Sequence, residues 1–88
     1  MKKLDIVYKK EALKFLFKND RFLQNKIEEK LNDYYILWKT NTDIKELSPK
    51  WNDLYRLRLW NLRIIFSNIN NTLTIIILKI GSRWDIYK

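Results

Sequence analysis

The sequence predicts a small α+β protein in which a helical hairpin covers one face of a mainly antiparallel, twisted sheet. Apolar residues recur at helical spacing in the first half of the chain and alternate with polar residues in the second half. Glycine and proline contribute one residue each, which favours a packed domain over disorder. The chain has 88 residues, so we expect a single domain over residues 1–88, with the order β-α-α-β-β-β and about four strands.

The first half of the chain predicts one strand and two helices. Residues 3–8 alternate, with Leu4, Ile6 and Tyr8 on one face, as is typical of a strand. Residues 9–18 predict a helix with an apolar stripe formed by Ala12, Leu13, Leu16 and Phe17. A second helix is expected from about Arg21 to about Lys39, because apolar residues recur every three or four positions: Leu23, Ile27, Leu31, Tyr34 and Trp38.

The second half predicts a loop followed by three strands. Residues 40–53 are polar and include the only proline, so we expect a loop with a short extended piece around residues 44–47. Alternating residues 55–59 and 62–67 predict a hairpin, with Trp60-Asn61 as its turn because asparagine tolerates the left-handed conformation. Residues 72–80 are rich in β-branched side chains and predict the last strand, which Gly81 is expected to end.

Composition excludes several classes of site. The chain has neither cysteine nor histidine, which excludes a disulfide, a Cys/His zinc site, a histidine general base and a Ser-His-Asp triad. We expect no metal and no other cofactor. No apolar run is long enough to span a bilayer, and the absence of cysteine fits a reducing compartment, so we expect a cytoplasmic protein without a membrane partner.

The charge is basic and unevenly distributed. The net charge of +8 implies an acidic partner, such as nucleic acid. Residues 54–88 contain six basic residues and one acid, and four of the five arginines lie there: Arg56, Arg58, Arg63 and Arg83. Arginine is the residue type suited to planar, bidentate contact with phosphate, so this half of the chain is the candidate site.

The hairpin turn brings two arginines together. A two-residue turn at Trp60-Asn61 places Arg58 directly opposite Arg63, with Cβ atoms roughly 5 Å apart, and Arg56 two residues along on the same face. Like charges facing each other destabilise a sheet, and neither strand contains an acid, so we expect an anion such as phosphate between them. The alternative is that these arginines are ordinary solvent-facing residues that discourage aggregation of the sheet edge.

Aromatic and further basic residues extend the candidate site. Trp60 at the turn and Trp84 beside Arg83 are candidates for stacking on a base, whereas Trp51 is expected to cover the rim of the core. Arg83 and Tyr87 follow the last strand, from which the chain can return beside the arginine face. We add Lys45 to the residues expected to contact phosphate.

The chain combines these features with several short motifs. They are Tyr8 with Glu11-Ala12-Leu13, Leu54-Tyr55-Arg56-Leu57-Arg58, Leu62-Arg63-Ile64-Ile65-Phe66, Ile80-Gly81-Ser82-Arg83 and Asp85-Ile86-Tyr87. In this order and spacing, nearly the whole chain resembles the RelE/ParE toxin superfamily. The resemblance implies a toxin of a type II toxin–antitoxin system, wrapped and neutralised by a cognate antitoxin in a hetero-oligomer.

The resemblance also implies an activity. RelE-like toxins enter the ribosomal A site, with expected contacts to 16S rRNA, and cut mRNA by attack of the 2′-OH without a metal. Carried over by position, Arg56, Arg58, Arg63, Arg83 and Tyr87 match functional residues of the family. We expect the catalytic residues to be Arg58, Arg63, Arg83 and Tyr87. The residues expected to bind RNA are Arg56, Arg58, Trp84 and Lys45. Fixed guanidinium groups suit this chemistry because in-line attack builds negative charge on the phosphate oxygens.

Proton transfer is the least determined part of this chemistry. Arginine does not lose its proton in proteins, so Tyr87 is the candidate base, with a pKa that neighbouring arginines lower; otherwise its ring packs on the sheet. Ser82 stands where some relatives carry histidine, which leaves the general acid open. Glu46 is a second candidate acid or base, and its simpler interpretation is a solvated loop carboxylate.

Two alternatives to the ribosome-dependent endoribonuclease remain. A ParE-like toxin shares the fold but inhibits DNA gyrase and is not a nuclease. A non-catalytic RNA-binding protein would keep the phosphate contacts without cleaving the strand.

Overall fold

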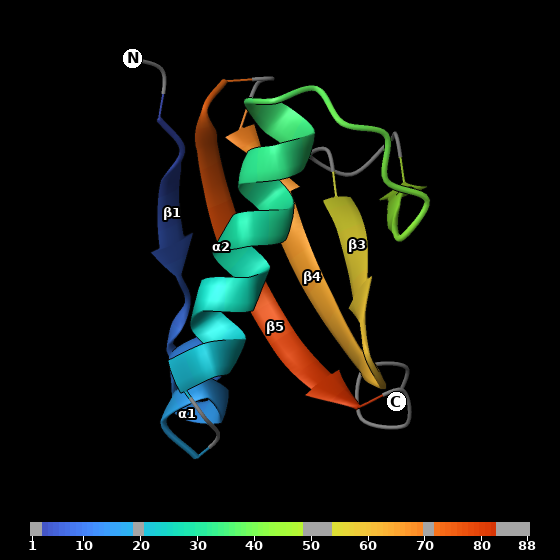
Figure 1. Cartoon of the computed structure of the whole chain (residues 1–88). Coiled ribbons are helices and arrows are strands. Elements are labelled where there is room, and N and C mark those ends of the chain that lie inside the picture. Colours follow the sequence, from blue (N-terminus) through green and yellow to red (C-terminus); the bar gives the residue numbers. More distant parts are fainter. Residues whose placement is uncertain (1–2, 19–20, 49–53, 70–71, 83–88) are drawn as a thin grey trace.

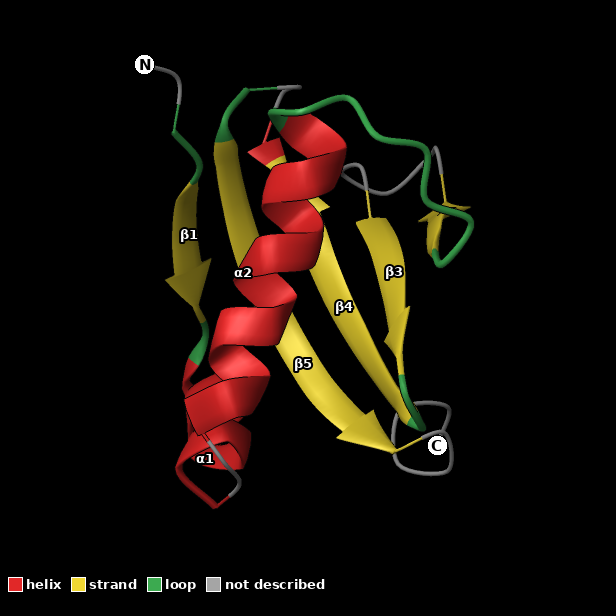
Figure 2. Ribbon diagram, viewed as in Figure 1, coloured by secondary structure: helices red, strands yellow, loops and turns green. Residues whose placement is uncertain are grey.

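The computed structural model describes residues 3–18, 21–48, 54–69 and 72–82, which form two helices and a five-stranded sheet (Figures 1 and 2). In chain order these elements are β1 (Asp5–Tyr8), α1 (Lys10–Lys18), α2 (Arg21–Tyr35), β2 (Ile44–Ser48), β3 (Leu54–Leu59), β4 (Leu62–Asn68) and β5 (Thr74–Ser82). The predicted α+β class is confirmed. The fifth strand is β2, at the extended piece expected within the loop.

The sheet has the strand order β1-β5-β4-β3-β2. Strands β2 to β5 form an antiparallel meander, whereas β1 pairs in parallel with β5. The chain therefore leaves β1 at one edge, passes through α1 and α2 across one face of the sheet, and re-enters at the opposite edge as β2 (Figure 2). This route brings the first strand beside the last and leaves the other face of the sheet without a helix in the described part of the chain (Figure 1).

The core lies between the two helices and the sheet. Alternate strand residues supply it, so Leu57, Ile64 and Ile77 have no exposed surface while their sequence neighbours face the other side. From α2, Ile27 and Leu31 are equally buried against them. Neither described helix is long and apolar enough to cross a membrane.

Helix α2 ends four residues earlier than predicted. Its stripe of Leu23, Ile27 and Leu31 is buried as expected, but the helix stops at Tyr35. The backbone N–H of Leu37 still donates to the carbonyl of Asn32 (3.2 Å), and the chain then reverses at Trp38, whose φ is 56°. Because this left-handed residue turns the chain away from the helix axis, Trp38 lies 82% exposed and is not part of the apolar stripe.

Helix α1 buries a narrower stripe than predicted. Ala12 and Leu16, one turn apart, are buried, and Phe15 packs beside them on the core. Leu13 and Phe17 are instead exposed, Phe17 by 83%. A helix of nine residues that contacts the sheet along one line leaves its remaining faces in solvent.

A β-bulge in β5 reverses which side of the sheet the later residues of this strand face. Ile65 of β4 pairs with Lys79 and Phe66 pairs with Ile77, so Leu78 is the extra residue between them. After this insertion Ile80 returns to the core, and Lys79 shares the opposite face with Ile65. The prediction that Gly81 ends the strand was wrong, because β5 continues to Ser82 and Gly81 pairs with Arg63.

A polar contact joins β1 to α2. The hydroxyl of Tyr8 donates to Oε2 of Glu28 at 2.6 Å, and the amide nitrogen of Gln24 donates to the same oxygen at 3.1 Å. Burial, together with the hydrogen bond to the Glu28 carboxylate, raises the pKa of Tyr8 well above its ordinary value. Folding therefore favours the protonated phenol.

This contact predicts a loss of stability in alkali. Below the ordinary tyrosine pKa of about 10 the contribution is complete, and above it the unfolded chain loses a proton that the folded chain keeps. We expect the free energy of unfolding to fall above pH 10, with a contribution from Tyr8 that approaches about 1.4 kcal/mol per pH unit. Urea denaturation between pH 8 and 11 should show a shallower decline for Tyr8→Phe than for wild type, with Tyr34→Phe as the control. Equal slopes for wild type and Tyr8→Phe would contradict the assignment.

Candidate nucleic-acid interface

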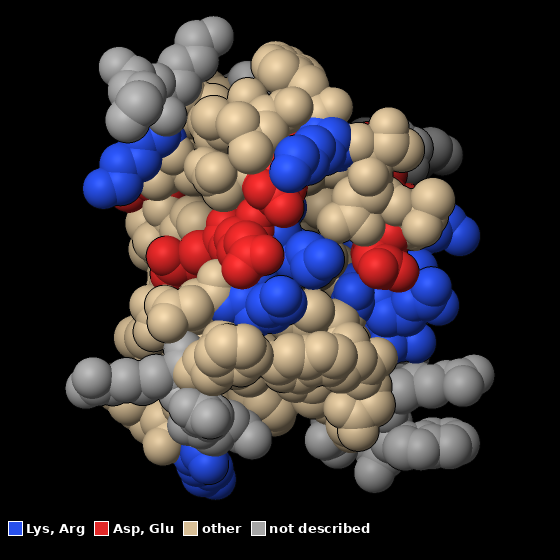
Figure 3. All heavy atoms as spheres, in the orientation of Figure 1, with Lys and Arg blue, Asp and Glu red and all other residues tan. Residues whose placement is uncertain are grey.

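The helix-free face of the sheet carries a group of cations, here called the basic face (Lys45, Arg56, Arg58, Arg63 and Lys79). The strand register aligns them in two rows. One row runs across the sheet through Lys45, Arg56, Ile65 and Lys79, and the next through Arg58, Arg63 and Gly81. In the space-filling view, basic side chains gather at the β2–β3 side of the molecule, beside an acidic side chain (Figure 3).

The predicted pairing of two arginines is confirmed. Arg58 of β3 lies directly opposite Arg63 of β4, and the strands are joined by the two-residue turn at Trp60 and Asn61. Trp60 adopts φ of 57°, and its ring stacks on Phe22 of α2 with centroids 6.2 Å apart. The turn is thus tied to the start of α2, which holds the two strands in this register.

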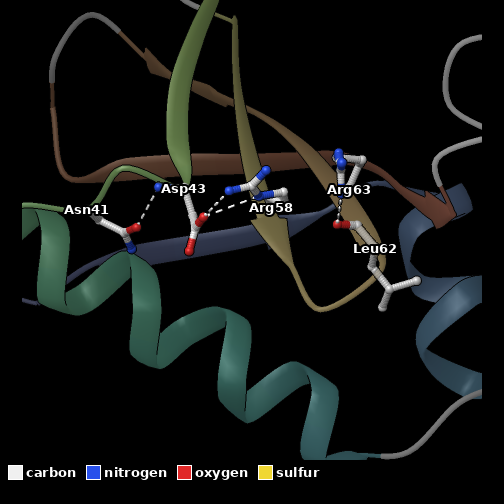
Figure 4. A network of polar contacts seen from close by, with 5 residues as sticks. All are labelled: Asn41, Asp43, Arg58, Leu62 and Arg63. Carbon is white, nitrogen blue, oxygen red and sulfur yellow. Dashed lines mark hydrogen bonds and ion pairs between the residues drawn. The ribbon is translucent and has the colours of Figure 1, made fainter.

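Neither β3 nor β4 contains an acid, as the sequence indicated, but the loop before β2 supplies one to Arg58. Oδ1 of Asp43, in the loop before β2, accepts hydrogen bonds from Nη2 (3.1 Å) and Nε (3.3 Å) of Arg58 (Figure 4). The sequence separates these residues by fifteen positions, so only the pairing of β2 with β3 brings them together. The Arg58 guanidinium group is directed at Asp43, and that of Arg63 lies apart from it (Figure 4).

The loop before β2 holds Asp43 in place through its backbone. The carbonyl of Asp43 accepts a hydrogen bond from the backbone N–H of Arg58 at 2.9 Å, and its own N–H donates to Oδ1 of Asn41 at 2.8 Å. This second contact is an Asx-turn, which stabilises the approach to β2. Asp43 is therefore a positioned partner for Arg58 and not a freely moving loop residue.

Arg56 and Arg63 each have a side-chain N–H group without a hydrogen-bond acceptor among the described residues. The Nε atom of each is buried and has no hydrogen-bond partner within the described ranges. Nη1 of Arg63 donates to the carbonyl of Leu62 at 3.2 Å. A buried N–H without an acceptor is unfavourable, so a bound anion with several oxygens would stabilise both side chains.

Two further residues shape the basic face. Lys79 was not predicted as a site residue, because simple alternation from Ile75 and Ile77 would direct it into the core, and only the bulge at Leu78 turns it to this face. Gly81 pairs with Arg63 and contributes no side chain to this face.

Some of the remaining predicted residues lie in the described part of the structure, and the others lie outside it. Lys45 lies on the basic face opposite Arg56, and its contact with phosphate stays a prediction. Glu46 pairs with Tyr55 and shares the helix-side face, away from the arginines. Trp51, Arg83, Trp84 and Tyr87 lie outside the described residues, so their roles stay predictions.

Comparison with solved structures identifies the fold. The chain resembles RelE in the archaeal RelE–RelB complex from Pyrococcus horikoshii, with 25% identity, a TM-score of 0.69, and coverage of 91% of this chain and 94% of that chain. It resembles a chain of the RelB–RelE antitoxin–toxin complex from Methanococcus jannaschii with 24% identity, a TM-score of 0.64 and coverage of 92% and 94%. For the isolated RelE toxin of E. coli the values are 16%, 0.63, 91% and 84%. No protein-family model matches the sequence, and no curated protein matches it significantly.

The ion pair between Asp43 and Arg58 predicts how the basic face responds to mutation. Asp43→Asn should release Arg58 and strengthen binding of a short single-stranded RNA by about two- to fivefold, the range set by an exposed ion pair. Fluorescence anisotropy at fixed salt measures this change. Glu29→Gln is the matched control, because it removes the same charge from α2 on the other side of the sheet. An equal gain in both variants would mean that only net charge matters.

Proposed function

The chain has the fold of the RelE toxins, and on this premise we propose that it is the toxin of a type II toxin–antitoxin pair and cleaves mRNA on the ribosome. The proposal treats residues 1–88 as one RelE-like toxin domain that acts in the cytoplasm, where its substrate is. Its immediate ligand is the RNA phosphate backbone, and its target is the strand in the ribosomal A site, with further contacts to 16S rRNA.

The observation that carries this proposal is the unsatisfied hydrogen-bonding capacity of Arg56 and Arg63. Both side chains lie on the basic face, and the buried Nε of each lacks an acceptor among the described residues. The register places them diagonally across neighbouring strands, since Arg56 pairs with Ile65 and Arg63 with Arg58. Neighbouring oxygens of one phosphate group match two guanidinium donors at such a spacing, so RNA binding would complete their hydrogen bonds.

In the proposed reaction, the RNA supplies its own nucleophile. The 2′-OH attacks the adjacent phosphorus, the bond to the 5′-oxygen of the next nucleotide breaks, and a 2′,3′-cyclic phosphate forms. Arg63, with Arg58 and Arg83, stabilises the charge that develops on the phosphate oxygens, while Arg56 and Lys45 hold the flanking backbone. Tyr87, as a phenolate, accepts the proton of the 2′-OH in this scheme, the departing 5′-oxygen takes up a proton from water, and no metal takes part.

The antitoxin partner is inferred from the neighbouring structures. Two of them are complexes of RelE with RelB, an antitoxin, from P. horikoshii and M. jannaschii. We propose that this chain likewise forms a hetero-oligomer with a cognate antitoxin. An antitoxin that blocked the basic face would carry acidic residues complementary to Arg56, Arg63 and Lys79.

The nuclease proposal predicts specific losses of activity. Arg63→Ala, Arg83→Ala and Tyr87→Phe should each reduce cleavage of a reporter mRNA in a translating extract by about 10²- to 10³-fold, the effect of removing one group that stabilises a transition state. Primer extension on the reporter maps the cuts and measures their yield. Lys26→Ala on α2, at the helix side of the sheet, should leave cleavage unchanged.

Two other results would overturn the proposal. Growth arrest without cuts in any mRNA would direct the search to DNA gyrase, which a toxin of this fold can inhibit without cleaving RNA. Binding of RNA that depends on Arg56 and Arg63 but is not followed by cleavage would leave a non-catalytic RNA-binding protein.

A further inference from the structure

We propose that the hollow at the end of α2, beside Trp38, binds a nucleobase of the same RNA strand whose phosphates lie on the basic face. This inference rests on the proposed function and adds a site for a base to a site for phosphate. The hollow is lined by Tyr34, Tyr35, Trp38, Lys39, Thr40 and Asn41 and has a volume of about 360 Å³. It therefore accommodates a planar base.

Trp38 departs from the expected behaviour of its residue type in two ways. Its large apolar side chain is 82% exposed, and its backbone adopts φ of 56°, a left-handed conformation that usually requires glycine. Unfavourable backbone geometry of this kind persists where the surrounding structure holds it, and it is concentrated at functional sites. The two departures together present an indole ring to solvent at a defined position.

The backbone around Trp38 is held by hydrogen bonds to the last turns of α2. The N–H of Lys39 donates to the carbonyl of Asp33 at 3.0 Å, and the N–H groups of Ile36 and Leu37 both donate to the carbonyl of Asn32. Because bonds on both sides of Trp38 return to the helix, the position of its backbone is defined by the helix end. The ring therefore extends from a fixed point at the edge of the hollow.

The walls and the rim of the hollow differ in character. Tyr34 and Tyr35 meet edge to face with centroids 4.9 Å apart, and Tyr35 contacts Phe66 of the core in the same manner at 6.3 Å. The wall is thus aromatic and anchored to the core. Lys39, Thr40 and Asn41 supply polar groups at the rim, which suits the edge of a base that carries donors and acceptors.

Hydrogen bonds link the hollow to the basic face. Asn41 lines the hollow, and its Oδ1 accepts a hydrogen bond from the N–H of Asp43, the residue that holds Arg58 (Figure 4). A residue of the hollow is therefore joined to Arg58 through Asp43. Proteins that bind single-stranded RNA combine a basic path for the backbone with aromatic rings for the bases, and this arrangement has both.

Charge favours RNA over a protein as the occupant. Lys39 lies at the rim, and Lys45 and Arg58 follow on the side of the basic face, so the surroundings attract an anionic strand. The exposed apolar surface here is that of Trp38 and Leu37, which is small for the helix of a protein partner.

The test compares intact and abasic RNA of eight nucleotides, in which one base at a time is removed, by fluorescence anisotropy with the full chain. For wild type we expect removal of the base at one position to weaken binding about five- to a hundredfold, the effect of one stacked base. Trp38→Gly should weaken binding of intact RNA to the same degree and become insensitive to removal of that base. Glycine favours the left-handed backbone, so this variant keeps the fold, and Trp38→Tyr should restore part of the discrimination.

The control and the contrary outcomes separate this inference from the proposed function. Phe17→Ala removes an exposed aromatic ring that lies on α1, away from the hollow. This variant should bind both kinds of RNA as wild type does. Equal weakening of intact and abasic RNA by Trp38→Gly, or no weakening, would overturn the base site while binding through Arg63 stands. Loss of binding to the antitoxin by Trp38→Gly, with RNA binding unchanged, would assign the hollow to the protein partner. Failure of wild type to bind any of the RNAs would overturn both proposals.

Discussion

Contact between α2 and the sheet determines which way every strand residue faces. Ile27 and Leu31 of the helix pack on Leu57, Ile64 and their neighbours, and all four of these side chains are fully buried. Since side chains alternate along a strand, burying one set directs the other set to the opposite face. The arginines of β3 and β4 gather on one surface because the leucines and isoleucines between them are held beneath the helix.

The same separation of faces explains how so small a protein tolerates its charge. The fully buried apolar side chains of the described residues form one cluster on the helix side, and the cations of the basic face do not belong to it. The basic face nevertheless concentrates five cations around one described acid, Asp43, and leaves buried donors on Arg56 and Arg63 without acceptors among the described residues. A ligand that carries negative charge would stabilise such an arrangement, as the proposed RNA ligand does.

Two departures from regular structure add to the surface that the sheet provides. The bulge at Leu78 moves Lys79 from the core side to the basic face, and the reversal at Trp38 turns an apolar residue of the predicted helix into an exposed ring. Each departure places a side chain where regular periodicity would not. Lys79 lies in the row next to that of Arg63, and Trp38 lines the same hollow as Asn41, which is hydrogen-bonded to Asp43.

The amino-acid sequence by itself determined the class of the fold, the two-residue turn at Trp60 and Asn61, and the pairing of Arg58 with Arg63. These features depend on periodicity and on residues close together in the chain, which a sequence displays directly. Only the tertiary structure decided that Asp43 holds Arg58 and that Lys79 joins the basic face. The ion pair joins residues fifteen positions apart, and the bulge is defined only by the pairing of two strands. Both depend on which strands lie side by side, which local sequence patterns do not show.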